Sequence, residues 1–166
     1  MAKLKLAIIV GSNRRESINR KLAQALAKLG EGAFDVSFVQ IDDLPMFNQD
    51  LESNRPESTL RLKREIEAAD AILIVTPEHN RSIPAVLKNA IDWASRPYGK
   101  NSWAGKTVAV TGTSGGAVGT AVSQNELRMI LTNLAGVGVG SQVFVTFKDD
   151  LIDAQLNVPN EATRGF

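Results

Sequence analysis

Residues 11–19, which read GSNRRESIN, combine the residue types that bind a phosphate group. They follow the apolar run of residues 6–10 and precede a helical pattern, so they form a turn that leads from a strand into a helix. Such a turn offers unpaired backbone amides and the positive end of the helix dipole to an anion. The polar and basic side chains of the turn are those of Ser12, Arg14, Arg15, Ser17 and Asn19. We therefore predict that the turn binds a phosphate monoester.

This turn matches neither of the two common nucleotide-binding fingerprints. It lacks the second and third glycines of a dinucleotide-binding turn and the Gly-Lys-Ser/Thr ending of an NTPase loop. ATP and an NAD bound in the Rossmann manner are therefore disfavoured. The alternative is a polar connection without a ligand, because α/β connections are commonly built from Gly, Ser and Asn.

A second polar loop, residues 76–82, lies between a buried strand and a helix. It carries a carboxylate, an imidazole, a carboxamide and a guanidinium in a row, on Glu78, His79, Asn80 and Arg81. A flat heteroaromatic ring with donors and acceptors along its edge, such as an isoalloxazine, fits such a backbone, with Pro77 packed on its face. The alternative is a solvated turn in which Glu78 caps a helix or pairs locally.

A third loop, residues 112–116, contains paired glycines that let backbone amides approach a ligand closely. Thr113 and Ser114 add hydroxyl groups, although ordinary helix entry explains the segment nearly as well. His79 is the only histidine, so a serine-histidine-acid triad could use only this one ring. Adjacent carboxylates elsewhere are better explained as solvated charge, so we expect no metal site.

Composition limits the class of protein. The 166 residues, 43% of them hydrophobic, suit one domain with a single core. The 19 basic and 18 acidic side chains are scattered, which argues against nucleic acid and membrane partners. Because the chain has no cysteine, any redox chemistry must come from a bound cofactor. No signal peptide or long apolar run is visible, so we expect a cytoplasmic protein.

Strand and helix patterns alternate along the whole chain. We predict strands at 4–10, 35–41, 71–76, 107–112 and 139–147. We predict helices at 17–29, at 57–69, from a cap at Ser82 with Pro84 in the first turn to about Ser95, and at 119–135. This pattern indicates an α/β doubly wound fold with a five-stranded parallel sheet in the order 2-1-3-4-5 and helices on both faces. The three polar loops then meet at the carboxyl ends of strands one, three and four.

The chain resembles the NADPH-dependent FMN reductases along essentially its whole length, most closely the chromate and quinone reductase branch. The resemblance rests on the turn after Gly11, on the block from Pro77 to Pro97 with its run LKNAIDWASRP, and on residues 104–119. It implies a flavodoxin-like fold, one non-covalent FMN, and NADPH or NADH as co-substrate. It also implies ping-pong reduction of a small-molecule acceptor, such as a quinone, a free flavin, an azo dye or a metal oxyanion like chromate.

Carried over by position, the resemblance also assigns site residues. In the turn that begins at Gly11, the FMN phosphate is held by Ser12, Arg14, Ser17, Ile18 and Asn19. The ring is lined by Pro77, Glu78, His79 and Asn80, and its other side is closed by Ser114 and Gly115. No side chain acts as a nucleophile, and the ring-edge candidates are Glu78, His79, Asn80 and Arg81. Most relatives have tyrosine where this chain has His79.

Relatives form dimers or dimers of dimers, so a homodimer or homotetramer is expected, with Asp92, Trp93 and Arg96 as interface candidates and Arg81 reaching across. The alternative for these residues is a helix end with an aromatic side chain in the core. Relatives also continue through one more helix, so we expect that the final C-terminal helix is missing from this sequence, or that a partner subunit supplies the cover.

Two other functions fit the same fold. A flavodoxin-type electron carrier binds FMN without NAD(P)H turnover, but flavodoxins are usually strongly acidic and this chain has a net charge of +1. A flavin-free binding or regulatory protein is the other alternative, and the presence of all three loops argues against it.

Overall fold

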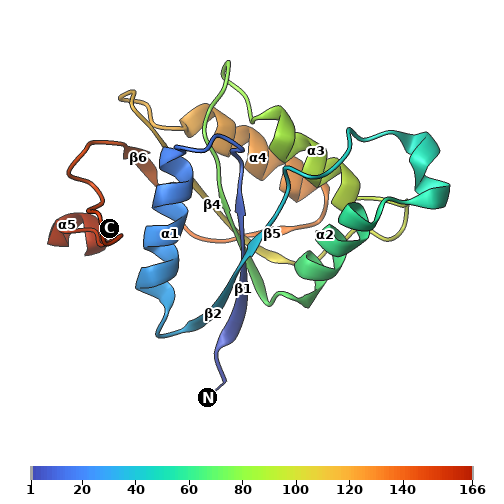
Figure 1. Ribbon diagram of the computed structural model, residues 1–166, viewed down its shortest axis with the longest axis horizontal. Coiled ribbons are helices and arrows are strands. Elements are labelled where there is room, and N and C mark those ends of the chain that lie inside the picture. Colours follow the sequence, from blue (N-terminus) through green and yellow to red (C-terminus); the bar gives the residue numbers. More distant parts are fainter. Residues whose placement is uncertain (1, 166) are drawn as a thin grey trace.

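The computed structural model describes residues 2–165, and a parallel β-sheet forms its centre (Figure 1). The long strands are β1 (Leu4–Val10), β2 (Phe34–Val39), β3 (Ala71–Val75) and β4 (Thr107–Ser114). Two short strands, β5 (Val137–Gly138) and β6 (Phe144–Thr146), both pair with β4. The order β2-β1-β3-β4-β5 confirms the predicted flavodoxin-like, doubly wound arrangement.

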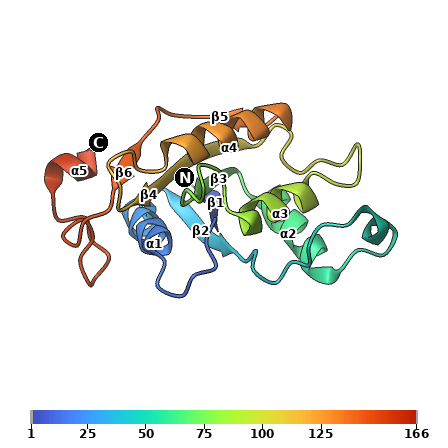
Figure 2. The same cartoon turned by 90° about the horizontal axis from the view of Figure 1, so that it is seen from above.

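Helices cover both faces of the sheet (Figures 1 and 2). They are α1 (Ile18–Gly30), α2 (Glu57–Ala68), α3 (Ala85–Ala94), α4 (Ala121–Asn133) and the short α5 (Glu161–Gly165), with a 3₁₀ helix, η1, at Gln49–Asn54. The buried side chains of α2, α3 and α4 share one hydrophobic cluster, whereas those of α1 share the other with Ile152 and Val158. Among residues 2–165, no helix has the length and apolar character needed to cross a bilayer.

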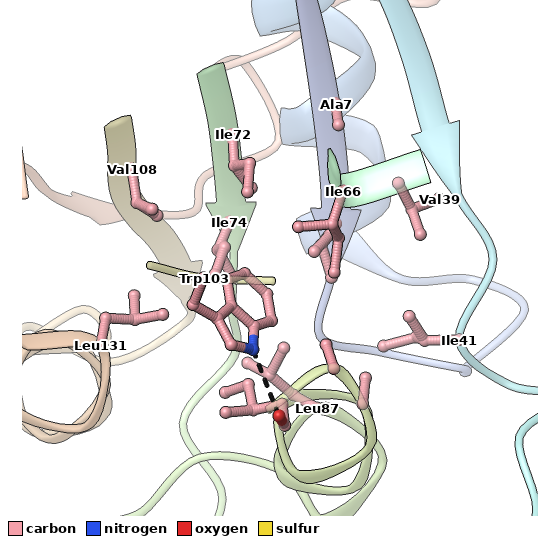
Figure 3. Packing of buried hydrophobic residues seen from close by; sticks show 14 of the residues in the cluster. Ala7, Val39, Ile41, Ile66, Ile72, Ile74, Leu87, Trp103, Val108 and Leu131 are labelled. Carbon is pink, nitrogen blue, oxygen red and sulfur yellow. Dashed lines mark hydrogen bonds between the residues drawn. The ribbon is translucent and has the colours of Figure 1, made fainter. Parts of the chain in front are cut away.

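Trp103 lies at the centre of the larger cluster, between β3 and α3 (Figure 3). Its side chain is fully buried, and its Nε1 donates to the carbonyl oxygen of Ile91 at 3.2 Å. A buried indole needs such a partner, because an unpaired donor in the core is costly. The contact joins the segment after α3 to the helix itself and so helps to fix the helix against the sheet.

The predicted fifth strand at 139–147 is wrong in extent, because the segment is divided into β5 and β6. Between them the chain advances six residues while β4 advances only four, from Val108 to Gly112, and Gly140 adopts a positive φ of 79°. Arg128 of α4 occupies the gap, where its Nη2 donates to the carbonyls of Val110 at 3.2 Å and Ser141 at 3.4 Å. A side chain thus satisfies a strand carbonyl that a continuous neighbour would have paired.

The predicted cap of α3 is also wrong. The N-cap is Pro84, without a side-chain hydrogen bond, and the helix begins at Ala85. Ser82 is held outside the helix, since its amide donates to His79 O at 3.0 Å and its hydroxyl donates to Glu126 Oε1 at 3.1 Å. Pro84 therefore precedes the first turn instead of occupying it.

Trp93 is not a surface residue, so its proposed place at a subunit interface is wrong. Its side chain is fully buried, and its Nε1 donates to Pro45 O at 2.7 Å. The ring of Phe47 meets it edge-on with 5.0 Å between centroids. The segment that contains η1, which the sequence did not predict, thus covers the end of α3, and the alternative of an aromatic side chain in the core is confirmed.

Candidate functional site

The three polar loops meet at the carboxyl end of the sheet, as predicted. The amide of Gly11, after β1, donates to Val75 O at the end of β3 at 2.9 Å. The amide of Thr76, after β3, donates to Thr111 O of β4 at 2.9 Å. Residues from three distant parts of the sequence therefore form one continuous rim.

Asn19 connects the first loop directly to the third. Its Nδ2 donates to Thr113 O and its Oδ1 accepts from Thr113 N, both at 2.9 Å, and the residue is only 2% exposed. Both polar groups of the side chain are thus used within the protein. For an anion bound at the first loop, Asn19 can contribute its backbone amide only.

Two glycines permit the close approach of these loops. A Cβ atom at Gly112 would lie 1.9 Å from the carbonyl oxygen of Thr76, a distance that no side chain tolerates. A Cβ at Gly11 would lie 3.0 Å from both Leu87 Cδ2 and Thr76 Oγ1. The absence of side chains here therefore has a packing reason that is independent of any ligand.

The donors of the first loop fit a phosphate group. Within residues 2–165, the backbone amides of residues 15–19 have no acceptor. Ser17 is the N-cap of α1, with its hydroxyl accepting from Arg20 N at 3.3 Å, and the first turn of α1 contains no acidic residue. Arg14 is exposed beside these donors. Unpaired amides, a helix N-terminus and an exposed guanidinium form a donor set that suits a phosphate group.

The second loop is a tight turn with a fixed backbone. His79 and Ser82 exchange both backbone hydrogen bonds at 3.0 Å, and the two residues between them adopt left-handed φ angles, 51° at Asn80 and 61° at Arg81. Such angles suit asparagine but are unusual for arginine. Within the described chain, the amides of Glu78, Asn80 and Arg81 have no acceptor, so they remain available to the edge of a ring.

The carboxylate of Glu78 is engaged with the protein itself. Its Oε2 accepts from the amides of Val122 at 3.0 Å and Ser123 at 3.3 Å, in the first turn of α4. Its Oε1 pairs with the Arg81 guanidinium at 3.0 Å, and the side chain is only 9% exposed. The local capping and pairing expected as the alternative is what this side chain does, while the backbone of the loop stays open.

The third loop is closed by Ser114. Its hydroxyl donates to Gly119 O at 2.7 Å and accepts from Gly116 N at 3.3 Å. Gly115 is exposed, and a Cβ built there would meet no other atom within 4 Å. The amide of Gly115 has no acceptor within residues 2–165, so it is the part of this loop that can contact a ligand.

Sequence reasoning did not identify Glu126 of α4 as part of this site. Its carboxylate accepts from Ser82 Oγ at 3.1 Å and from Ile83 N at 3.3 Å. Its partner Ser82 lies 44 positions earlier in the chain, and nothing in the sequence around Glu126 indicates this contact. Only the packing of α4 beside the loop reveals the contact.

Two hollows in the described surface lie beside the rim. One, of about 240 Å³, lies between the ends of β1 and β2 and shares Ser12 with the first loop. The other, of about 510 Å³, lies between β6 and α5. Neither of these two hollows spans all three loops.

Comparisons with known proteins agree with this geometry. The family model for NADPH-dependent FMN reductases matches residues 4–150. A 2-hydroxy-1,4-benzoquinone reductase from a Burkholderia species is 47% identical over 164 residues, which are 98% of this chain and 90% of that protein. A quinone reductase from Pseudomonas putida is 48% identical over 130 residues, 78% of this chain and 70% of that protein.

Solved structures give the same result. FerB, a flavoenzyme NAD(P)H:(acceptor) oxidoreductase from Paracoccus denitrificans, matches with a TM-score of 0.95 and 44% identity over 98% of this chain and 90% of that chain. A flavodoxin from Pseudomonas aeruginosa, at 20% identity and a TM-score of 0.60 over 88% and 86% of the two chains, shares the fold alone.

Proposed function

Because the chain belongs to the NADPH-dependent FMN reductase family and is an FMN-dependent NAD(P)H oxidoreductase, we propose that it reduces quinones at the rim formed by its three loops. The observation that carries the choice of acceptor is the 47% identity, over 98% of the chain, with a 2-hydroxy-1,4-benzoquinone reductase. Free flavins, azo compounds and metal oxyanions such as chromate are further candidate acceptors, which rest on the family resemblance alone.

The first loop holds the phosphate of FMN. The amides of residues 15–19 and the charge of Arg14 bind the anion, and the hydroxyl groups of Ser12 and Ser17 lie beside them. Their support is the set of unpaired donors at the N-terminus of α1. Ile18 and Asn19 take part through their amides, since Asn19 uses its side chain on Thr113.

The second and third loops orient the ring. FMN, when bound, supplies the two-electron redox chemistry that the protein's own side chains lack. The backbone amides of Glu78, Asn80, Arg81 and Gly115 have no acceptor within residues 2–165, and they would face the ring edge, where they would stabilise the negative charge of the reduced flavin. Pro77 would pack against the ring, and the exposed side chain of His79 would lie beside it.

An open rim suits alternating use of one site. The reduced nicotinamide nucleotide and the quinone occupy the same exposed face in turn, which gives ping-pong kinetics. Positioning by the loops supplies the protein's part of the rate enhancement. No side chain acts as a nucleophile in this scheme, and the exposed positions of His79, Asn80 and Arg81 favour contacts with the ring edge and the incoming substrate.

The proposal is tested by the visible spectrum of the purified protein, followed by anaerobic titration with NADPH or NADH and then with 1,4-benzoquinone. A flavin spectrum that is bleached by the nucleotide and restored by the quinone is the expected result. A yellow protein that neither nucleotide bleaches is a flavodoxin-type carrier. A colourless protein that cannot take up FMN is a binding or regulatory protein.

The core and the exposed apolar surface support proposals for the domain organisation and the oligomeric state. We propose that residues 1–166 form a single domain, supported by two hydrophobic clusters on the two faces of one sheet. Self-association as a homodimer or homotetramer is supported by exposed apolar side chains in and near α4, with Val118 52% and Met129 67% exposed. Light scattering on the purified protein measures the oligomer size directly.

We base the proposals for cellular location and partners on the composition of the chain. The lack of cysteine is compatible with a reducing cytoplasm, which is the location we propose. The net charge of +1 supports a small-molecule partner over nucleic acid or an anionic membrane.

A further inference from the structure

Two glutamates join the second loop to helix α4 in opposite directions. Glu78 of the loop accepts two backbone amides from the first turn of α4, those of Val122 and Ser123. Glu126, one turn further along α4, accepts the hydroxyl of Ser82 and the amide of Ile83 at the other end of the loop. We name this reciprocal pair, Glu78 and Glu126 with their four hydrogen bonds, the glutamate clasp.

We propose that Glu126 is a positioning residue for the flavin ring: it anchors the C-terminal end of the second loop so that the amides of Glu78, Asn80 and Arg81 face the rim. The proposal rests on the FMN site proposed above. Glu126 acts through the loop and is not assigned a contact with FMN or substrate.

The loop needs an anchor at this end. Its tip carries left-handed φ angles of 51° and 61° at Asn80 and Arg81, and the unfavourable angle at Arg81 persists only where the surroundings impose it. Glu78 fixes the N-terminal side of the tip. On the C-terminal side, the hydroxyl of Ser82 and the amide of Ile83 make their hydrogen bonds to the Glu126 carboxylate.

The helix that follows cannot take over this role. α3 begins after Pro84, which caps it without a side-chain hydrogen bond. Ile83 is 7% exposed, so its amide would be left with little access to water if Glu126 were shortened. An unpaired buried donor is costly, and the expected response is a shift of the loop toward solvent.

Charge and position can be separated by substitution. The partners of Glu126 in the described chain are a hydroxyl and an amide, both neutral donors. Glutamine keeps a carbonyl oxygen that accepts from Ile83 N, and its own amide can donate to Ser82 Oγ. Glu126→Gln therefore keeps the anchor and removes the charge, whereas Glu126→Ala removes both.

The test compares the wild type with E126A and E126Q. Glu65→Ala is the matched loss of a helical glutamate, because Glu65 pairs with Arg61 on its own helix, α2. Hydrogen exchange of the apo-protein measures the loop without any flavin. We expect E126A to exchange the amides of His79 and Ser82 at least tenfold faster, with E126Q and E65A close to the wild type.

Flavin binding gives the second readout. Because the anchor acts on the ring and not on the phosphate, E126A should weaken the binding of FMN and the binding of riboflavin by the same factor, about tenfold. E126Q should restore both affinities. A wild-type protein that binds neither flavin refutes the proposed function, while the exchange experiment still tests the anchor.

Three results would overturn the inference: unchanged exchange in E126A, unchanged affinity for riboflavin, or a loss in E126A that E126Q reproduces, which would show that charge and not position matters. If E126A does not fold, Ser82→Ala removes one bond of the clasp. That variant must then show faster exchange at His79 for the inference to stand.

Discussion

Single residues at the rim do two separate jobs, holding the loops together and presenting donors. Asn19 and Gly112 belong to the first group, because Asn19 bonds to Thr113 and Gly112 leaves room for the Thr76 carbonyl. Arg14 belongs to the second, since it is exposed at the turn. Substitutions in the two groups should therefore affect different measurements.

At Gly112, alanine should destabilise the fold. Its Cβ would lie 1.9 Å from Thr76 O, so the ends of β3 and β4 must separate, at a cost of about 3 kcal/mol or more. Urea unfolding measures the loss. Gly116→Ala is the matched control, because the nearest atom to its Cβ lies 3.8 Å away, and equal stability of the two variants would refute the packing role.

At Arg14, alanine should weaken FMN binding and leave riboflavin binding unchanged. A charge-assisted contact with phosphate contributes about 1.5–3 kcal/mol, which corresponds to a loss of roughly tenfold to 150-fold. Fluorescence titration of the apo-protein with each flavin measures the two affinities. Unchanged retention of FMN would place the phosphate elsewhere.

At the scale of elements, α2 holds the segment that follows α3. Lys63 Nζ donates to the carbonyls of Ala94 at 3.2 Å and Lys100 at 2.6 Å, while Ser102 Oγ donates to Glu67 Oε1 at 2.6 Å. The hydrogen bond from Ser102 is the main cause that lowers the pKa of Glu67, and burial lowers the pKa of Lys63. These contacts hold the segment leading to Trp103, and so support the core beneath the rim.

The lowered pKa of Glu67 gives a prediction for pH. Its carboxylate binds protons more weakly in the folded state, so it stabilises the protein above the unfolded pKa and loses this effect as the pH falls below 4.5. Ser102→Ala should reduce the stability that the protein loses on acidification through Glu67. Urea melts at neutral pH and below pH 4.5 measure the free energy of unfolding at each pH. Ser53→Ala, at an exposed serine, is the control. An identical pH dependence in S102A and the wild type would contradict the assignment.

At the scale of the whole molecule, two hydrophobic clusters sandwich the sheet, and the larger one supports the rim from below. It includes Leu87, whose Cδ2 lies 3.0 Å from a Cβ built on Gly11, so core packing reaches the phosphate turn directly. Because protein interiors are close-packed, a cavity in this cluster should lower global stability and not only that of one element.

Trp103→Ala tests this connection. Truncation of a fully buried tryptophan should cost about 3–5 kcal/mol, and it also removes the bond to Ile91 O. Thermal or urea unfolding gives the value, and Tyr98→Ala, at a side chain 91% exposed, should stay within about 0.5 kcal/mol of the wild type. A small effect at Trp103 would mean that the cluster tolerates repacking.

The sequence by itself determined the features that depend on local pattern. β3 is read from a continuous apolar run, and β1 and β4 are read from the apolar runs at residues 6–10 and 108–110, because strands buried on both faces need apolar side chains on each. The three polar loops follow directly from the ends of those strands, and the parallel topology then brings them to one rim. The presence of α1, α2 and α4 was similarly clear from helical periodicity.

Tertiary structure alone decided the features that depend on partners distant in the chain. The division of the last strand depends on the hydrogen bond from Arg128 to Val110 O. The burial of Trp93 depends on its bond to Pro45 O, and the anchoring of the second loop depends on Glu126. Each is a hydrogen bond between residues far apart in sequence, formed because a buried polar group must find a partner wherever packing brings one near. No local pattern records which partner that will be.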